Sequence, residues 1–251
     1  MKHVELPVRT RLAMFVRLLA IQGAWNYETL LGNGIGFCVE PALRLLPGGQ
    51  GGDAYRSALA RQSQYFNAHP YMAAVAVGAL ARAELDGEPP ARIERFRTAL
   101  CGPLGSVGDR LVWAAWLPAC SIAALAAFGF GVGMGGVLLV FLGIYNAGHL
   151  ALRAWGLSAG LEHGMKVAAS LGAPVLRQGP AHIAQVAALI GGVALPLALD
   201  RVIGPGRALF GIVLGGVALG GLVLARLHGR AEGWKIGVGL LVLFVLYSVA
   251  R

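Results

Sequence analysis

The stretch LVWAAWLPACSIAALAAFGFGVGMGGVLLVFLGIYNAG, residues 111–148, carries no charged side chain. One helix needs about 20 apolar residues to cross the hydrocarbon core of a bilayer, so this stretch is long enough for two spans. The glycine-rich segment 129–136 is the expected point of reversal between them. Further uncharged runs at 183–199, 208–225 and 236–250 raise the prediction to about five hydrophobic spans.

The composition of the whole chain also indicates a membrane protein. Of its 251 residues, 57% are hydrophobic and 13% are charged, whereas about 25% are charged in an ordinary soluble domain. The formal charge of +9 comes from scattered Arg and Lys residues without a long basic run, which favours anchoring to lipid headgroups over nucleic-acid binding. We therefore expect an all-α, polytopic membrane protein with no nucleic-acid partner.

The two parts of the chain differ in charge. Residues 1–110 hold 12 basic and 9 acidic side chains, whereas residues 111–251 hold 9 and 3. We predict an amphipathic helical region with broken or re-entrant helices over 1–110 and a transmembrane helical body over 111–251. Within the first region, residues 11–46 are expected to be helical, with breakers at Pro41 and at 47–49.

Several short patterns admit more than one explanation. Gly156, Gly160 and Gly164 have the spacing of a close helix contact, although a glycine-rich apolar chain also produces this spacing by chance. GVGMGG, residues 131–136, fits the dinucleotide pattern G-x-G-x-x-G but lies in an apolar run instead of after a strand. The six histidines and three cysteines are dispersed, without the spacing of metal ligands. We therefore predict no cofactor and no metal site.

The first polar constellation lies in AIQGAWNYETLLGNGIGF, residues 20–37. On a helix, Gln22 and Asn26 would share one face, with Trp25 and Glu28 beside it. Amides bond hydroxyl groups and an aromatic ring stacks on the apolar face of a sugar, so these residues fit a sugar site. They also fit an interfacial helix whose Trp anchors at headgroup depth, and the residue types alone favour this second interpretation.

The second constellation is Asn67-x-His69-Pro70, at the start of an apolar run that extends to residue 81. Pro70 disfavours helix at His69, so Asn67 and His69 are expected where a helix is interrupted. Non-helical backbone at membrane depth is tolerated only inside protein or along a water-filled cavity, and broken helices are where transporters commonly bind substrate. In the alternative interpretation, Asn67 caps the helix that follows.

The third constellation is CGPLGSVGDRLVW, residues 101–113. Its three glycines and one proline are expected to exclude a regular helix. Asp109 then opens the first long apolar span. There it either belongs to a substrate site or acts as the N-cap of that span.

Four motifs together resemble one family of bacterial membrane proteins. They are QGAWNYE (22–28), YFNAHP (65–70), GPLGSVGD (102–109) and YNAGHLALRAWG (145–156). In their order and spacing, these motifs resemble those of the IID component of the mannose/fructose/sorbose family of the bacterial phosphotransferase system. The resemblance covers roughly residues 9–200.

The resemblance implies a function that composition does not. Such a protein is a non-catalytic permease subunit that carries a hexose across the bacterial cytoplasmic (inner) membrane together with a IIC subunit. IIA and IIB proteins relay the phosphate, so no histidine of this chain is expected to be phosphorylated. The implied assembly is a trimer of IIC–IID units. The candidate substrate-binding or gating residues, with no catalytic residue among them, are Gln22, Trp25, Asn26, Glu28, Asn67, His69, Asp109 and Asn146.

The chain departs from the family pattern at three places. Arg110 stands where the family usually has proline, His149 stands where it usually has arginine, and DRVIGPGRA (200–208) replaces a longer polar segment. Three interpretations therefore stay open. The chain is a working IID subunit, a divergent IID-like partner with a structural or regulatory role, or a transporter or enzyme that acts alone.

Overall fold

The computed structural model describes residues 6–203, 215, 218 and 219. In this part of the chain every regular element is helical, which confirms the predicted all-α class. The elements are, in chain order, α1 (Val8–Leu18), α2 (Gly32–Leu43), α3 (Asp53–Gln62), α4 (Ala73–Leu85), α5 (Pro90–Gly108), the π-helix η1 (Asp109–Trp116), α6 (Leu117–Gly129), α7 (Met134–His163), the short 3₁₀-helix η2 (Gly164–Lys166), α8 (Ala168–Leu171) and α9 (Pro174–Ile203).

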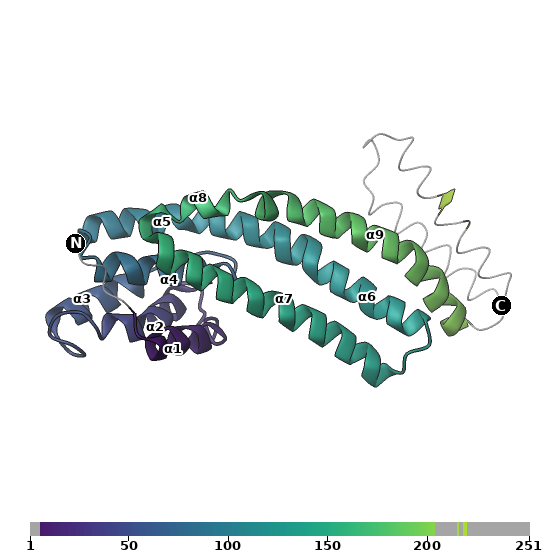
Figure 1. Cartoon of the computed structure of the whole chain (residues 1–251), viewed down its shortest axis with the longest axis horizontal. Helices are drawn as coiled ribbons and strands as arrows, with labels where there is room; N and C mark the ends of the chain where they lie inside the picture. The colour runs from purple at the N-terminus through teal and green to yellow at the C-terminus, as the bar shows by residue number, and fades with distance from the viewer. Residues whose placement is uncertain (1–5, 204–214, 216–217, 220–251) are drawn as a thin grey trace.

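Figure 1 shows α1–α4 gathered at one end of three long helical segments. These segments, Pro90–Gly129, Met134–Lys166 and Ala168–Val202, are each long and apolar enough to cross a membrane. The first has 40 residues and extends about 60 Å at 1.5 Å per residue, twice the ~30 Å thickness of the hydrocarbon core. One half of it can therefore pack against the N-terminal helices while the other half crosses the membrane.

The predicted spans agree with the helices wherever the structure describes them. α6 ends at Gly129 and α7 begins at Met134, so the chain reverses within the predicted segment 129–136. The uncharged run 183–199 lies inside α9. The two remaining runs, near the C-terminus, fall almost entirely outside the described residues.

α4 and α7 pack with their backbones in contact. A Cβ atom built on Gly160 would overlap the carbonyl oxygen of Val75, and one built on Gly78 would overlap that of Leu157. A Cβ atom on Gly156 would lie 3.1 Å from the Val75 side chain. The glycine spacing of α7 therefore marks a close helix contact, and the explanation by chance is not needed.

We predict that Gly160→Ala lowers the free energy of unfolding by about 1–3 kcal/mol, because the added methyl group forces two backbones apart. Gly143→Ala is the matched control, since it lies in the same helix and its Cβ atom would meet nothing within 4 Å. Thermal unfolding of both purified variants in detergent checks this. Equal melting temperatures would contradict the close contact.

The first helical region has a break that the sequence did not predict, and the predicted break at Pro41 is absent. The other predicted break, at 47–49, does lie in the non-helical link between α2 and α3. α1 ends at Leu18, residues 19–31 form turns, and Pro41 lies inside α2. Pro41 has no N–H to bond the carbonyl of Phe37 four residues earlier. The Arg17 guanidinium donates to that carbonyl instead, at 2.8 Å. The proline is therefore tolerated because a side chain of α1 satisfies the group that it leaves free.

The prediction that Gln22 and Asn26 share a helical face is also wrong. Leu30 has a φ of +50°, a left-handed conformation that a right-handed helix does not contain. The Asn26 Oδ1 atom accepts hydrogen bonds from the backbone N–H groups of Glu28 and Thr29, at 3.0 and 2.9 Å. Asparagine commonly competes with helix formation by such local bonds, and here they close a turn.

Residues 101–113 correct a third prediction, because they are helical throughout. α5 continues past Pro103 to Gly108, and the π-helix η1 follows directly. A π-helix bonds each residue to the fifth before it, and it occurs as an interruption of α-helices at functional sites. Asp109 therefore does not cap the start of a span: it lies inside a continuous helix and makes no capping bond.

Candidate functional site

A cavity of about 610 Å³ lies where the 19–31 turns, the link between α3 and α4, and the α5–η1 junction meet. We call it the polar cavity. Five predicted site residues line it, namely Gln22, Trp25, Asn67, His69 and Asp109. The rest of its lining consists of Leu31, Tyr65, Ala68, Pro70, Cys101, Gly102, Gly105, Ser106 and Trp113.

Two non-helical segments form one wall of the cavity by pairing with each other. The 63–72 connection, between α3 and α4, runs beside the 19–31 turns. The Leu31 N–H donates to the carbonyl of Phe66 at 2.9 Å, and the Phe66 N–H donates to the carbonyl of Thr29 at 3.1 Å. The interrupted backbone thus satisfies part of its own hydrogen bonding, as a buried non-helical segment must.

Asn67 and His69 lie in the middle of this connection, where the sequence predicts an interrupted helix. α4 begins only at Ala73, its N-cap residue is Met72, and no side chain caps it. The alternative in which Asn67 caps the apolar helix is therefore wrong. Asn67 is exposed and lines the polar cavity.

His69 is the most buried polar side chain of the cavity, with 2% of its surface exposed. Its Nδ1 atom accepts a hydrogen bond from the Tyr71 N–H at 3.2 Å, so the neutral ring carries its proton on Nε2. Burial lowers the pKa of His69 to about 4, an effect that Asp109 opposes and Arg153 reinforces. The ring is therefore neutral near pH 7. Nε2 has no partner among the described residues, which leaves one N–H donor for a ligand.

The other lining residues supply complementary chemistry. Asn67 offers an amide donor and acceptor, Asp109 offers a carboxylate that accepts from hydroxyl groups, and the indole of Trp25 is 45% exposed. Tyr27 holds the Trp25 ring edge to face, with 4.8 Å between ring centroids. Convergent donors and acceptors beside an aromatic face suit a neutral ligand that is rich in hydroxyl groups.

Three predicted site residues lie outside the polar cavity. Asn26 shapes the neighbouring turn, and Glu28 is exposed on that turn. Asn146 lies on α7, where its Nδ2 donates to the carbonyl of Leu142 at 2.6 Å and its Oδ1 lies 2.8 Å from Nε2 of His149. Any contact of these residues with a ligand of the polar cavity is therefore indirect.

Sequence reasoning missed Arg97 and Arg153, which are 5% and 4% exposed and contact the 63–72 connection. Arg153 has a detectable signal, since it is the first charged residue after the uncharged run, and ionisable residues within spans are commonly functional. Arg97 has none, because Arg92 and Arg95 precede it in the same helix and the sequence does not distinguish the buried one.

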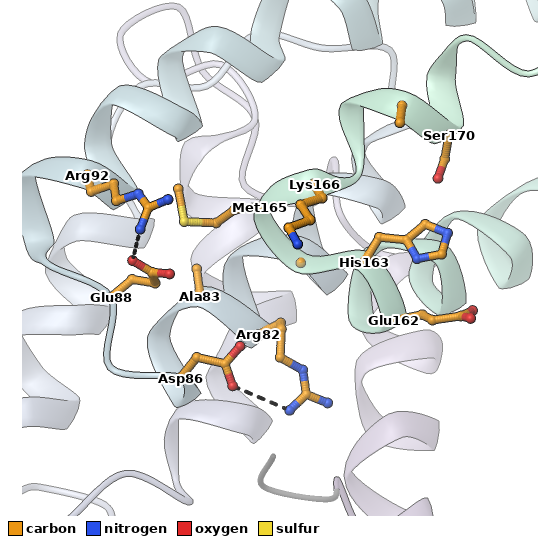
Figure 2. Close-up of a pocket in the computed structure, with 12 residues that line it drawn as sticks. Arg82, Ala83, Asp86, Glu88, Arg92, Glu162, His163, Met165, Lys166 and Ser170 are labelled. Carbon is orange, nitrogen blue, oxygen red and sulfur yellow. Dashed lines mark hydrogen bonds and ion pairs between the residues drawn. The ribbon is translucent and has the colours of Figure 1, made fainter. Parts of the chain in front are cut away.

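A larger cavity, of about 790 Å³, lies between the end of α4, the start of α5 and the end of α7 (Figure 2). Its two arginines are engaged: Arg92 bonds Glu88 at 2.7 Å, and Arg82 lies 3.8 Å from Asp86. It holds no predicted site residue and no Trp, Tyr or Phe to stack on a sugar. Its lining is Arg82, Ala83, Asp86, Glu88, Arg92, Glu162, His163, Gly164, Met165, Lys166, Ala169 and Ser170.

We predict that Asn26→Ala lowers the free energy of unfolding by about 1 kcal/mol, because two backbone N–H groups lose their acceptor. Asn26→Asp keeps an acceptor oxygen and should lose less. Asn33→Ala, an exposed asparagine of α2, is the control. Melting temperatures that are equal in Asn26→Ala and Asn33→Ala would show that the turn does not depend on this side chain.

Comparison with known proteins gives a consistent result. The family described as the PTS system mannose/fructose/sorbose family IID component matches residues 5–199. The chain is 30% identical over 174 residues to the mannose-specific EIID component of Escherichia coli K12, covering 66% of this chain and 59% of that protein. It is 29% identical over 177 residues to the fructose permease IID component of Bacillus subtilis, covering 66% of this chain and 61% of that one. The match thus spans about three fifths of these relatives.

Solved structures show that the fold is known. One chain, described as the structure of a membrane protein, superimposes with a TM-score of 0.68 at 22% identity and 98% coverage of both chains. A chain from the cryo-EM structure of the mannose transporter ManYZ with microcin E492 superimposes with a TM-score of 0.55 at 23% identity, covering 98% of this chain and 97% of that one.

Proposed function

The chain belongs to the IID component family of mannose/fructose/sorbose phosphotransferase systems, and we propose that it carries a hexose across the bacterial inner membrane together with a IIC subunit. The polar cavity is the observation that carries this proposal. It places the free His69 N–H, the Asn67 amide and the Trp25 ring around one space beside an interrupted helix. That is the arrangement in which membrane transporters bind substrate.

Each group has a defined part in holding the sugar. The His69 Nε2–H donates to a hydroxyl oxygen, the Asn67 amide exchanges hydrogen bonds with a second hydroxyl, and the Asp109 carboxylate accepts from others. The Trp25 ring covers the apolar face of the sugar. A neutral His69 suits a neutral ligand, because no charge is then buried without a partner.

The IIC subunit is proposed to cover apolar surface that this chain leaves open. Large side chains of α7 and α9 are exposed, among them Leu139 at 73% and Leu189 at 76%. Lipid and a partner helix can both cover such positions, and assembly as a trimer of IIC–IID units divides the surface between them. IIB, charged by IIA, then phosphorylates the sugar, so this chain carries no phosphate itself.

Two departures from the family pattern are compatible with transport. Arg110 is exposed, and its Nε atom donates to the carbonyl of Ser106 at 3.3 Å, so it continues the helix without entering the cavity lining. His149 stacks on Tyr71 with 5.1 Å between ring centroids. Because the polar lining of the cavity is retained, a partner without transport is the weaker alternative.

We predict that Asn67→Ala and His69→Ala each weaken sugar binding about fivefold, because a lost bond to a neutral group costs about 1 kcal/mol. Uptake kinetics in cells that express the chain with its IIC, IIB and IIA proteins measure this as a raised KM. Asn33→Ala and His182→Ala remove the same residue types from exposed positions outside the cavity and should leave KM unchanged.

Copurification of IIC with each variant shows whether the complex is intact. A normal KM in both cavity variants, with the complex assembled, would rule out a sugar site here. A raised KM in His182→Ala as well would show that the effect is not specific to the cavity.

We also predict that labelled phosphoenolpyruvate, supplied with the soluble relay proteins, leaves all six histidines of this chain unlabelled. The reason is structural for His69, because its Nε2 lies in a buried space and its Nδ1 is engaged by the backbone. Labelling of IIB in the same reaction is the positive control. Stable label on this chain would overturn the assigned roles.

A further inference from the structure

Arg97 and Arg153 are buried cations without a counter-charge in the part of the chain that the structure describes. They extend from two different long helical segments, α5 and α7. No carboxylate of the described residues lies within ion-pair distance of either side chain, and the Nε atom of each has no acceptor there. A buried ionisable side chain in a membrane helix is costly, which makes a functional role the first hypothesis for each arginine.

Arg97 binds the beginning of the 63–72 connection. Its Nη1 atom donates to the carbonyl of Tyr65 at 2.9 Å, and its Nη2 atom donates to the carbonyls of Gln62 and Gln64 at 2.8 and 2.6 Å. The guanidinium also lies 5.2 Å from the ring centroid of Phe66. One planar group thus contacts four of the five residues from 62 to 66, where α3 ends.

Arg153 binds the other end of the same connection. Its guanidinium lies 4.7 Å from the ring centroid of Tyr71, and its Nη1 atom donates to the carbonyl of Leu18, the last residue of α1. A cation at a helix C-terminus is favourable because the carbonyl groups there carry partial negative charge. Tyr71 is also held by its own hydroxyl, 2.6 Å from that of Tyr145 on α7.

We propose that Arg97 and Arg153 are positioning residues that clamp the two ends of the 63–72 connection and thereby aim Asn67 and His69 into the polar cavity. Neither arginine lines the cavity, so neither touches the ligand. The effect on sugar binding rests on the function proposed above, but the clamp itself does not. Because the guanidinium groups bind carbonyl oxygens and ring faces, their role is one of geometry and not of charge alone.

Lysine substitution separates geometry from charge. Arg97→Lys keeps the charge but cannot reach three carbonyl oxygens with a planar fork, so it should behave almost like Arg97→Met. Arg153 makes one hydrogen bond and one cation–π contact, both of which an ammonium group can make, so Arg153→Lys should be milder than Arg153→Met. Arg95→Met, an exposed arginine two residues before Arg97, is the matched control.

The thiol of Cys101 reports on the clamp without any sugar. Cys101 lines the polar cavity, is half-buried, and lies one turn after Arg97. Cys38 and Cys120 are buried and are replaced by alanine, so that Cys101 is the one thiol of this chain that N-ethylmaleimide can label in the assembled IIC–IID complex. Loosening of the connection in Arg97→Lys, Arg97→Met and Arg153→Met should raise the labelling rate severalfold.

Uptake kinetics supply the second measurement. If the clamp aims the binding groups, the KM for sugar should rise about tenfold in Arg97→Lys, with the maximal rate less affected. Unchanged Cys101 labelling in all four variants of Arg97 and Arg153, or full rescue of labelling and KM by Arg97→Lys, would overturn the proposal.

The two measurements also separate this proposal from the proposed function. Faster labelling in the arginine variants, with no protection of Cys101 by any hexose in the wild type, would retain the clamp and refute the sugar site. Protection of Cys101 by a hexose in the wild type, with unaltered labelling in the variants of Arg97 and Arg153, would retain the sugar site and refute the clamp.

Discussion

The backbone contact between α4 and α7 is the constraint on which the rest of the structure depends. Eleven of the thirteen residues of α4 are buried, so this short helix is enclosed by protein on nearly every side. It can lie that deep only because Gly78 and Gly160 remove the side chains that would otherwise separate the two backbones. The position of α4 in turn fixes where the 63–72 connection enters, and the C-terminal half of α7 carries Arg153 to that connection. Packing of two helices thus determines where the interrupted backbone lies.

An interrupted backbone inside a membrane protein must satisfy its polar groups within the protein. Here the pairing of Phe66 with Thr29 and Leu31 satisfies one part, and Arg97 satisfies three further carbonyl oxygens. One buried polar side-chain atom of the connection stays without a hydrogen-bond partner among the described residues. The His69 Nε2 atom is buried and has no partner in the described part of the chain, and its residue lines the polar cavity. The same network therefore stabilises the connection and leaves one donor free.

The sequence predicted features that depend on composition and local pattern. The uncharged runs located the spans and the reversal before Met134, and the proline after His69 located the interruption between α3 and α4. Features that depend on tertiary contacts were mispredicted. Pro41 reads as a breaker because its helix alone leaves a carbonyl unpaired, and only the folded chain brings Arg17 to it. Five of the eight candidate residues meet in one cavity, whereas Asn26 was assigned to a helix that its own side chain prevents.

The motif GPLGSVGD, residues 102–109, acquires a physical explanation from the helix that contains it. Residues three apart lie on one face of a helix, so Gly102, Gly105 and Gly108 form a stripe without side chains along α5. A Cβ atom at the first two would meet nothing within 4 Å, and both line the polar cavity, so they leave it open. A Cβ atom on Gly108 would overlap the ring of His69, so this glycine lets the imidazole approach the helix. The motif ends on the carboxylate of Asp109, which lines the same cavity. Helix propensity alone predicts that these glycines break a helix. In the structure they lie within a helix and allow it to form one wall of the candidate binding site.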